Sequence, residues 1–209
     1  MPTPASDTAL ALILAAGRGE RMRPLTDHTP KPLLRVHGQP LMGWHVNALR
    51  ASGHTRLLAN TAWLGEQIEA AFGDVLMYSH EGRDFGGALE TAGGIARALP
   101  RLDEVFWLVA GDVFVPGFRF DAATRERFAA GDKLAHLWLV PNPAHNPRGD
   151  FGLAPEGLAL NGDGPDGLRY TYSTIALLRH GLFQPPLLDI PLGNPEGIKA
   201  PLGALLRRA

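Results

Sequence analysis

Cysteine is absent from the 209-residue sequence. Its absence excludes disulfide bonds, thiolate metal sites and a cysteine nucleophile, and it fits a protein of the reducing cytoplasm. The start of the chain also lacks a long apolar run. Residues 10–15 form only a short one with no basic segment before it, which argues against a signal peptide and a membrane-spanning helix.

An excess of charge of either sign is lacking as well. The chain has 20 Lys and Arg against 21 Asp and Glu, and its formal net charge is −1. No global basic field therefore exists to hold nucleic acid or an anionic membrane, so affinity for phosphate must come from a local site. The hydrophobic share of 45% is that of an ordinary globular protein and excludes a disordered chain.

Apolar runs alternate with segments of helical spacing in the first half of the sequence. The predicted strands are residues 10–15, 56–62, 74–79 and 104–110, and the predicted helices are residues 40–52, 64–72 and 89–99. This alternation predicts an α/β fold with a mostly parallel sheet and helices on both faces.

The second half changes character. The predicted strands 133–140, 150–154 and 169–178 lie between turns rich in Gly, Pro, Asn and Asp, and residues 198–209 resemble a short helix. A mixed or antiparallel extension of the same sheet is therefore expected. We expect one domain over residues 1–209, with the four tryptophans in its core.

A loop rich in glycine and arginine follows the first predicted strand. Ligands bind beyond the carboxyl ends of parallel strands, and Gly17 and Gly19 would let backbone N–H groups approach phosphate oxygens. Arg18, Arg21 and Arg23 add guanidinium groups that suit phosphate. The loop lacks the Walker and dinucleotide patterns. It predicts a phosphate site, and a solvated basic loop is the alternative.

Two further residues are candidates for phosphate chemistry. Lys31 lies between Pro30 and Pro32, which stiffen the backbone around a single positive charge. Asp112 follows the buried strand 104–110, where a carboxylate can hold Mg²⁺ against a triphosphate. Taken alone, Lys31 fits an exposed lysine in a turn better than a site residue, and Asp112 fits an ordinary turn equally well.

Together these segments carry a resemblance to a known family. The run L-A-A-G-R-G-E-R-M-R-P-L-T followed by P-K-P-L resembles the signature of the sugar-1-phosphate nucleotidylyltransferases. The resemblance continues through N-T-A-W-L-G-E-Q-I, E-G, L-E-T-A-G-G-I and V-A-G-D-V to R-G-D-F. Within the family the sequence is most similar to the uridylyltransferases that act on N-acetylmuramate 1-phosphate in the peptidoglycan recycling of the bacterial cell wall.

The resemblance implies a fold, a reaction and partners. The fold is a three-layer, Rossmann-like nucleotidyltransferase fold, with residues 1–115 as the nucleotide-binding half and residues 116–209 as the sugar-phosphate-binding half. The reaction joins UTP and N-acetylmuramate 1-phosphate, depends on Mg²⁺ and releases pyrophosphate. The implied partners are the nucleoside triphosphate and a sugar 1-phosphate, without nucleic acid or membrane.

The resemblance also implies roles for residues. Arg21, Lys31 and Asp112 are the expected catalytic residues, and Asp112 is the metal ligand as well. The residues expected at the nucleotide are Ala15, Ala16, Gly17, Gly19, Arg21, Asn60 and Gly93. The residues expected at the acceptor are Glu90, Asn142, Arg148, Asp150 and Thr174, with Arg148 as the cation for a sugar acid. Glu90 fits a helix-capping role equally well.

Two departures from the family pattern matter. The pattern W-x-D-V/I-G-T, whose aspartate is the second metal ligand in the family, does not occur in the sequence. We therefore expect nucleotide binding with slow turnover. Thr174 replaces the usual glycine of F-S-G-I, which narrows the expected sugar pocket. Two alternatives stay open: a guanylyl- or thymidylyltransferase acting on mannose or glucose 1-phosphate, and a non-catalytic nucleotide-sugar-binding regulator. Retention of Arg21, Lys31 and Asp112 argues against the regulator.

Overall fold

A six-stranded sheet forms the centre of the molecule in the computed structural model, which describes residues 9–209. Its strands are β1 (Ala9–Ala15), β4 (Leu57–Thr61), β5 (Met77–His80), β6 (Leu102–Ala110), β7 (Ala135–Val140) and β10 (Thr171–Arg179), in the order β5-β4-β1-β6-β10-β7. The first four of these strands run parallel, and β10 is antiparallel to both β6 and β7. The predicted mixed, mostly parallel sheet is thereby confirmed.

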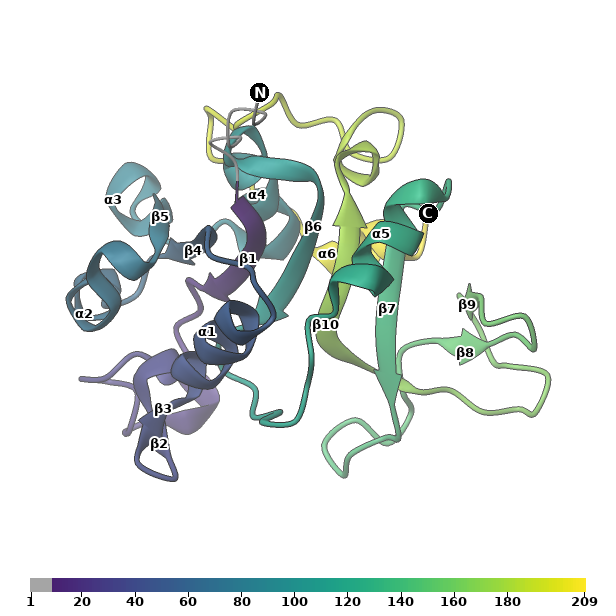
Figure 1. Ribbon diagram of the computed structural model, residues 1–209, viewed down its shortest axis with the longest axis horizontal. Coiled ribbons are helices and arrows are strands. Elements are labelled where there is room, and N and C mark those ends of the chain that lie inside the picture. The colour runs from purple at the N-terminus through teal and green to yellow at the C-terminus, as the bar shows by residue number, and fades with distance from the viewer. Residues whose placement is uncertain (1–8) are drawn as a thin grey trace.

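Helices cover both faces of the sheet (Figure 1). Helices α1 (Leu41–Ala51), α2 (Gly65–Phe72) and α5 (Ala122–Ala130) pack one hydrophobic cluster against one face, and α4 (Glu90–Ala98) and α6 (Leu202–Leu206) pack a second cluster against the other. These three layers are the predicted ones. None of the helices in residues 9–209 has the length and apolar character needed to cross a membrane.

The sequence analysis missed several short elements. Helix α3 (Glu81–Phe85) lies where a loop was expected, and α5 was not predicted because Phe128 is its one buried residue. Short hairpins join β2 (Arg35–Val36) to β3 (Gln39–Pro40) and β8 (Gly152–Leu153) to β9 (Ala159–Leu160). The predicted strand 150–154 was wrong in its partner, because β8 pairs with β9 and not with the central sheet.

The C-terminal segment docks on the start of α4 through its backbone. The N–H groups of Ala92 and Gly93 donate to the Ala200 carbonyl at 2.8 and 3.1 Å. Asn194, which is fully buried, donates through Nδ2 to the Gly93 carbonyl at 3.0 Å. A Cβ at Gly93 would collide with the carbonyl of Ile198, so only glycine allows this close approach. The docking fixes α6 beside α4.

We predict that Gly93→Ala destabilises the fold by about 1–3 kcal/mol, because the added methyl group must push backbone atoms of residues 198–200 away. Urea denaturation measures the change in the free energy of unfolding. Gly117→Ala is the matched control, since nothing lies within 4 Å of a Cβ at that position. Equal stability of the two variants would contradict the docking.

Candidate active site

A cavity of about 580 Å³ lies beyond the carboxyl ends of β1, β4 and β6. The predicted site residues that line it are Ala15, Ala16, Gly17, Gly19, Lys31, Asn60, Glu90, Asp112 and Thr174. They come from elements far apart in the sequence and meet because parallel strands end at one edge of the sheet. The structure thus brings most of the predicted nucleotide residues together with two of the predicted acceptor residues, Glu90 and Thr174.

Lys31 and Asp112 form an ion pair in this cavity. Lys31 Nζ lies 2.6 Å from Asp112 Oδ2, and the two side chains are 25% and 35% exposed. The lysine begins a single 3₁₀ turn, Lys31–Leu33, in which Pro32 is buried, so its backbone is anchored as the flanking prolines predicted. The pair places a mobile cation and an oxygen ligand at one point of the cavity wall.

A buried carboxyl supports the wall between β1 and α4. Asn60 accepts the backbone N–H of Ala15 through Oδ1 at 2.8 Å and donates through Nδ2 to Glu81 Oε1 at 2.7 Å. The other oxygen of Glu81 accepts the N–H of Leu89 at 2.8 Å. Glu81 is fully buried, and this burial raises the pKa of its carboxyl, although the two hydrogen bonds oppose the rise.

Sequence reasoning missed Glu81, which also lines the cavity. It lies in the E-G segment of the family resemblance, and that segment was the only available signal. Asn60, which was expected at the nucleotide, lines the cavity and bonds the backbone of β1 and the Glu81 carboxyl. Together the two side chains set the position of the cavity floor at Ala15.

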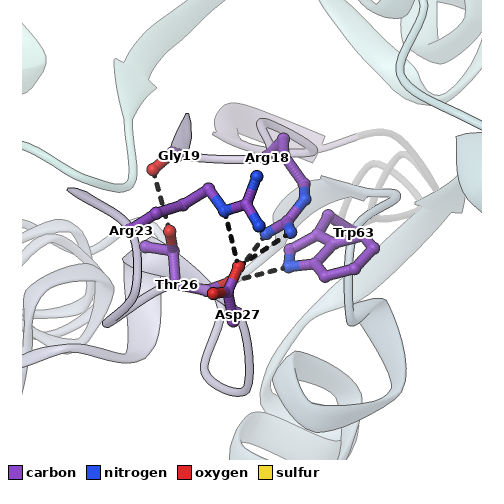
Figure 2. Close-up of polar contacts among 6 residues, drawn as sticks. All are labelled: Arg18, Gly19, Arg23, Thr26, Asp27 and Trp63. Carbon is purple, nitrogen blue, oxygen red and sulfur yellow. Dashed lines mark hydrogen bonds and ion pairs between the residues drawn. The ribbon is translucent and has the colours of Figure 1, made fainter. Parts of the chain in front are cut away.

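Arg18 fixes the shape of the glycine-rich loop instead of facing the cavity (Figure 2). Its guanidinium lies 3.5 Å from the ring centroid of Trp63 and donates to the Thr26 carbonyl at 2.8 Å and to Asp27 Oδ1 at 3.1 Å. The indole N–H of Trp63 donates to the same Thr26 carbonyl at 3.0 Å. Trp63 and Trp44 are half-buried and lie outside both hydrophobic clusters, so the prediction that the tryptophans belong to the core was wrong for these two. Trp107 and Trp138 confirm it, since Trp107 is buried and Trp138 packs against the same cluster.

Arg23 joins the same cluster. Its Nε donates to Asp27 Oδ1 at 2.8 Å, and the hydrogen bond from Arg18 together with the charge of Arg23 holds the pKa of Asp27 below its ordinary value. Thr26 Oγ1 donates to the Gly19 carbonyl at 2.9 Å and closes the loop. Of the three arginines that suggested a phosphate site, Arg18 and Arg23 therefore shape the loop from within.

The remaining predicted residues lie outside the cavity lining. Arg21 is exposed on the 3₁₀ turn Glu20–Met22, and Gly93 faces the docked C-terminal segment. Arg148 is exposed. Asn142 and Asp150 are engaged at the start of β10, where Asn142 Oδ1 accepts from the Thr171 hydroxyl at 2.9 Å and Asp150 Oδ2 accepts the Tyr172 N–H at 2.8 Å.

Two buried histidines anchor the loop that carries Asp112. His45 Nε2 donates to the Val113 carbonyl at 2.8 Å, and His54 Nε2 donates to the Phe120 carbonyl at 2.9 Å. Burial lowers the pKa of both imidazoles and outweighs the hydrogen bonds, which raise it. Both ends of the Asp112 loop are therefore tied to the helical layer by neutral imidazoles.

The fold and the cavity define an α/β protein with a candidate ligand site at the carboxyl ends of its parallel strands. Residues 11–136 match the model of the MobA-like NTP transferase domain, and the chain belongs to that family. The predicted enzyme class, a nucleotidyltransferase, is confirmed by this match.

Two uridylyltransferases are similar to much of the chain. The chain is 47% identical over 203 residues to the N-acetylmuramate alpha-1-phosphate uridylyltransferase of Neisseria meningitidis, an alignment that covers 94% of this chain and 83% of that protein. A protein with the same name from Caulobacter vibrioides is 34% identical over 138 residues, which covers 62% of this chain and 52% of that protein.

A solved structure supports the fold alone. The inositol-1-phosphate CTP transferase of T. maritima superposes with a TM-score of 0.66 at 19% identity, covering 98% of this chain and 82% of that chain. The resemblance to sugar-1-phosphate nucleotidylyltransferases is confirmed by the family model and the two relatives.

We predict that His45→Gln flattens the dependence of stability on pH. Because the folded pKa of His45 lies below its ordinary value of 6.5, the unfolded chain binds the proton more readily. Stability is therefore lost as the pH falls from 6.5 toward the folded pKa. Urea denaturation at pH 7 and pH 5 should show a smaller loss in His45→Gln than in the wild type. His145→Gln, at an exposed position, should keep the wild-type loss.

Proposed function

We propose that the protein transfers the uridylyl group of UTP to N-acetylmuramate 1-phosphate, giving UDP-N-acetylmuramate and pyrophosphate in peptidoglycan recycling. The observation that carries the proposal is the 47% identity to a uridylyltransferase of that name along 94% of the chain. The cavity supports it, because Lys31 and Asp112 lie together among the small residues of the β1 loop.

The cavity has two sides that suit two substrates. Ala15, Ala16 and Gly17 follow β1, and with Asn60 and Glu81 they form the side toward β4, where we place the nucleotide. Small residues there leave room for the sugar and base edges. The opposite side is formed by β6 and β10 and includes Thr174, and we place the sugar phosphate there.

The chemistry requires charge neutralisation more than an activated nucleophile. An oxygen of the sugar phosphate attacks the α-phosphorus of the triphosphate, a new P–O bond forms, and the bond to the β-phosphate oxygen breaks in line as pyrophosphate leaves. Lys31 lies where the two anions would meet and can neutralise charge on the α-phosphate. The substrate phosphate already carries the negative charge of a nucleophile, so no protein base takes a proton.

Asp112 is the residue that would hold Mg²⁺. Within residues 9–209 no three His, Asp or Glu side chains converge as a metal site, so the protein offers one carboxylate, which suits Mg²⁺ when phosphate oxygens and water complete its shell. The ion would add positive charge at the triphosphate. Asp112 is paired with Lys31, so its carboxylate would be free to hold the ion only with Lys31 turned toward phosphate, and the two side chains would act together.

We predict that the protein releases pyrophosphate from UTP and N-acetylmuramate 1-phosphate. A coupled pyrophosphate assay measures the rate, and ATP, CTP, GTP and dTTP serve as competing nucleotides. Mannose and glucose 1-phosphate serve as competing acceptors. Faster turnover with GTP and mannose 1-phosphate, or with dTTP and glucose 1-phosphate, would overturn the proposed substrates and keep the enzyme class.

A second prediction concerns Lys31. Lys31→Ala should lower kcat about 100- to 1,000-fold, since a positioned donor at developing charge contributes roughly 3–4 kcal/mol. Lys133→Ala is the matched control, because Lys133 is 63% exposed and lies outside the cavity. An unchanged kcat in Lys31→Ala would remove the lysine from the reaction. Circular dichroism of both variants checks that the fold is intact.

A further inference from the structure

Two hydroxyl-bearing residues of β10 form part of the cavity wall on the acceptor side. Tyr172 and Thr174 both line the cavity. In the register of the sheet, Ile175 pairs with Val109, so Thr174 lies at the end of β6 near Ala110 and close to the start of the Asp112 loop. Both residues therefore lie on the side of the cavity that β6 and β10 form, opposite the side toward β4.

Both hydroxyl oxygens are buried and lack a hydrogen-bond partner within the described structure. Burial raises the pKa of the Tyr172 phenol, which therefore stays a neutral donor. A buried hydroxyl without a partner loses its hydrogen bonds to water and gains nothing in return. Phenylalanine at position 172 would avoid this cost, so the folded, ligand-free protein gives no reason for a hydroxyl at this position.

The backbone at Thr174 is strained as well. Its φ is 65°, in the left-handed region, where a β-branched side chain is disfavoured and glycine is free of strain. The pairing of β10 with β7 shifts register between Tyr172 and Ala176, so a bulge turns this segment. Two independent costs, an orphaned hydroxyl and a strained backbone, thus coincide at one wall of the cavity.

A network of hydrogen bonds holds Thr171 and Tyr172 of β10 in place. Asp150 Oδ2 accepts the Tyr172 N–H at 2.8 Å and also accepts from Asn146 Nδ2 at 3.2 Å. Asn142 Oδ1 accepts from the Thr171 hydroxyl at 2.9 Å. Asp150, which was expected at the acceptor, thus holds the backbone of Tyr172, and Asn142, which was also expected there, holds the neighbouring Thr171.

Charge along the cavity limits what the two hydroxyls can meet. The ionisable acidic and basic side chains that line it are Lys31, Glu81, Glu90 and Asp112. The one cation among them is paired with Asp112. On the side of β10 the polar groups available to the acceptor are therefore the neutral hydroxyls of Tyr172 and Thr174, whose oxygens are buried, and a hydrogen bond to a buried group is strong.

We propose that the hydroxyls of Tyr172 and Thr174 are specificity-determining groups that hydrogen-bond an oxygen-bearing substituent of the acceptor sugar. The inference rests on the proposed function, because it takes the β10 side of the cavity as the acceptor side. It explains why both costs are retained: the bound acceptor supplies the missing partners. An acceptor lacking the substituent leaves both hydroxyls unpaired and is rejected.

The test compares Tyr172→Phe with Thr174→Gly and Thr174→Ser. Without ligand, Tyr172→Phe and Thr174→Gly should each raise Tm by about 2–4 °C, since each removes a cost of the folded state. With saturating UTP, each should raise KM for N-acetylmuramate 1-phosphate about 10-fold. KM for UTP should stay within a factor of about two, and Thr174→Ser, which keeps the hydroxyl, should keep the wild-type KM.

Tyr78→Phe is the matched control. The Tyr78 hydroxyl donates to the Gly73 carbonyl at 2.9 Å and lies outside the cavity. Its removal should lower Tm and leave both KM values unchanged, the opposite pattern to Tyr172→Phe. A fall in Tm for Tyr172→Phe would overturn the inference, because it would reveal an internal partner for the hydroxyl.

The outcomes separate this inference from the proposed function. Wild-type turnover of N-acetylmuramate 1-phosphate with an unchanged KM in Tyr172→Phe would overturn the inference alone. Equal rises in KM for UTP and acceptor would also overturn it, since the hydroxyls would then belong to both substrates. If the wild type uses another sugar 1-phosphate, the proposed acceptor fails, and the ratio of KM between variant and wild type is measured with that sugar.

Discussion

The contact between Lys31 and Asp112 joins the two parts of the chain on which the site depends. The lysine belongs to the loop after β1 and the carboxylate to the loop after β6, neighbouring strands of one parallel sheet. Any reaction between two phosphate esters must overcome their repulsion, so positive charge has to gather at one place. The chain has a net charge of −1, so this positive charge does not come from a basic surface. It comes from Lys31, which lines the cavity at the carboxyl ends of the strands.

Carboxylates around the cavity are used mainly to fix the shape of its walls. Asp27 gathers Arg18 and Arg23, Glu81 links β4 to the start of α4, and Asp150 holds the backbone of β10. Each accepts hydrogen bonds from two residues, and these bonds fix the loop that carries the carboxylate or join it to a neighbouring strand or helix. Because these carboxylates are engaged, Asp112 and Glu90 are the acidic side chains of the cavity without such a fixed structural role.

The sequence was most informative where a local pattern has one structural outcome. Buried strands flanked by glycine predicted β1, β4 and β6, and the rule that ligands lie beyond strand ends pointed to the loop after β1 and to Asp112 after β6. The role of Lys31 was implied by the family resemblance. The sequence was least informative where a side chain can contact either of two partners. Arg18 could face phosphate or stack on Trp63, and this depends on a residue 45 positions away that no local pattern connects to it. Gly93 was read as a nucleotide contact, whereas its packing against Ile198 follows from the path of a distant segment.

Residues whose conformation or surroundings are unfavourable for their type are the remaining guide to the function of the cavity. Gly93 stands where a close backbone contact requires glycine, so packing alone explains it. Thr174, by contrast, has a left-handed backbone conformation that a β-branched residue disfavours. Tyr172 buries a hydroxyl group without a hydrogen-bond partner in the described residues. A stable sequence would remove such conflicts unless something outside the fold offsets them. Both conflicts occur on the wall shared with β6, close to the end of the strand that leads to Asp112. By our proposal, a ligand that bonds the two hydroxyls offsets these costs, and a ligand that cannot bond them leaves the costs in place. The difference between the two binding free energies is the selectivity of the site.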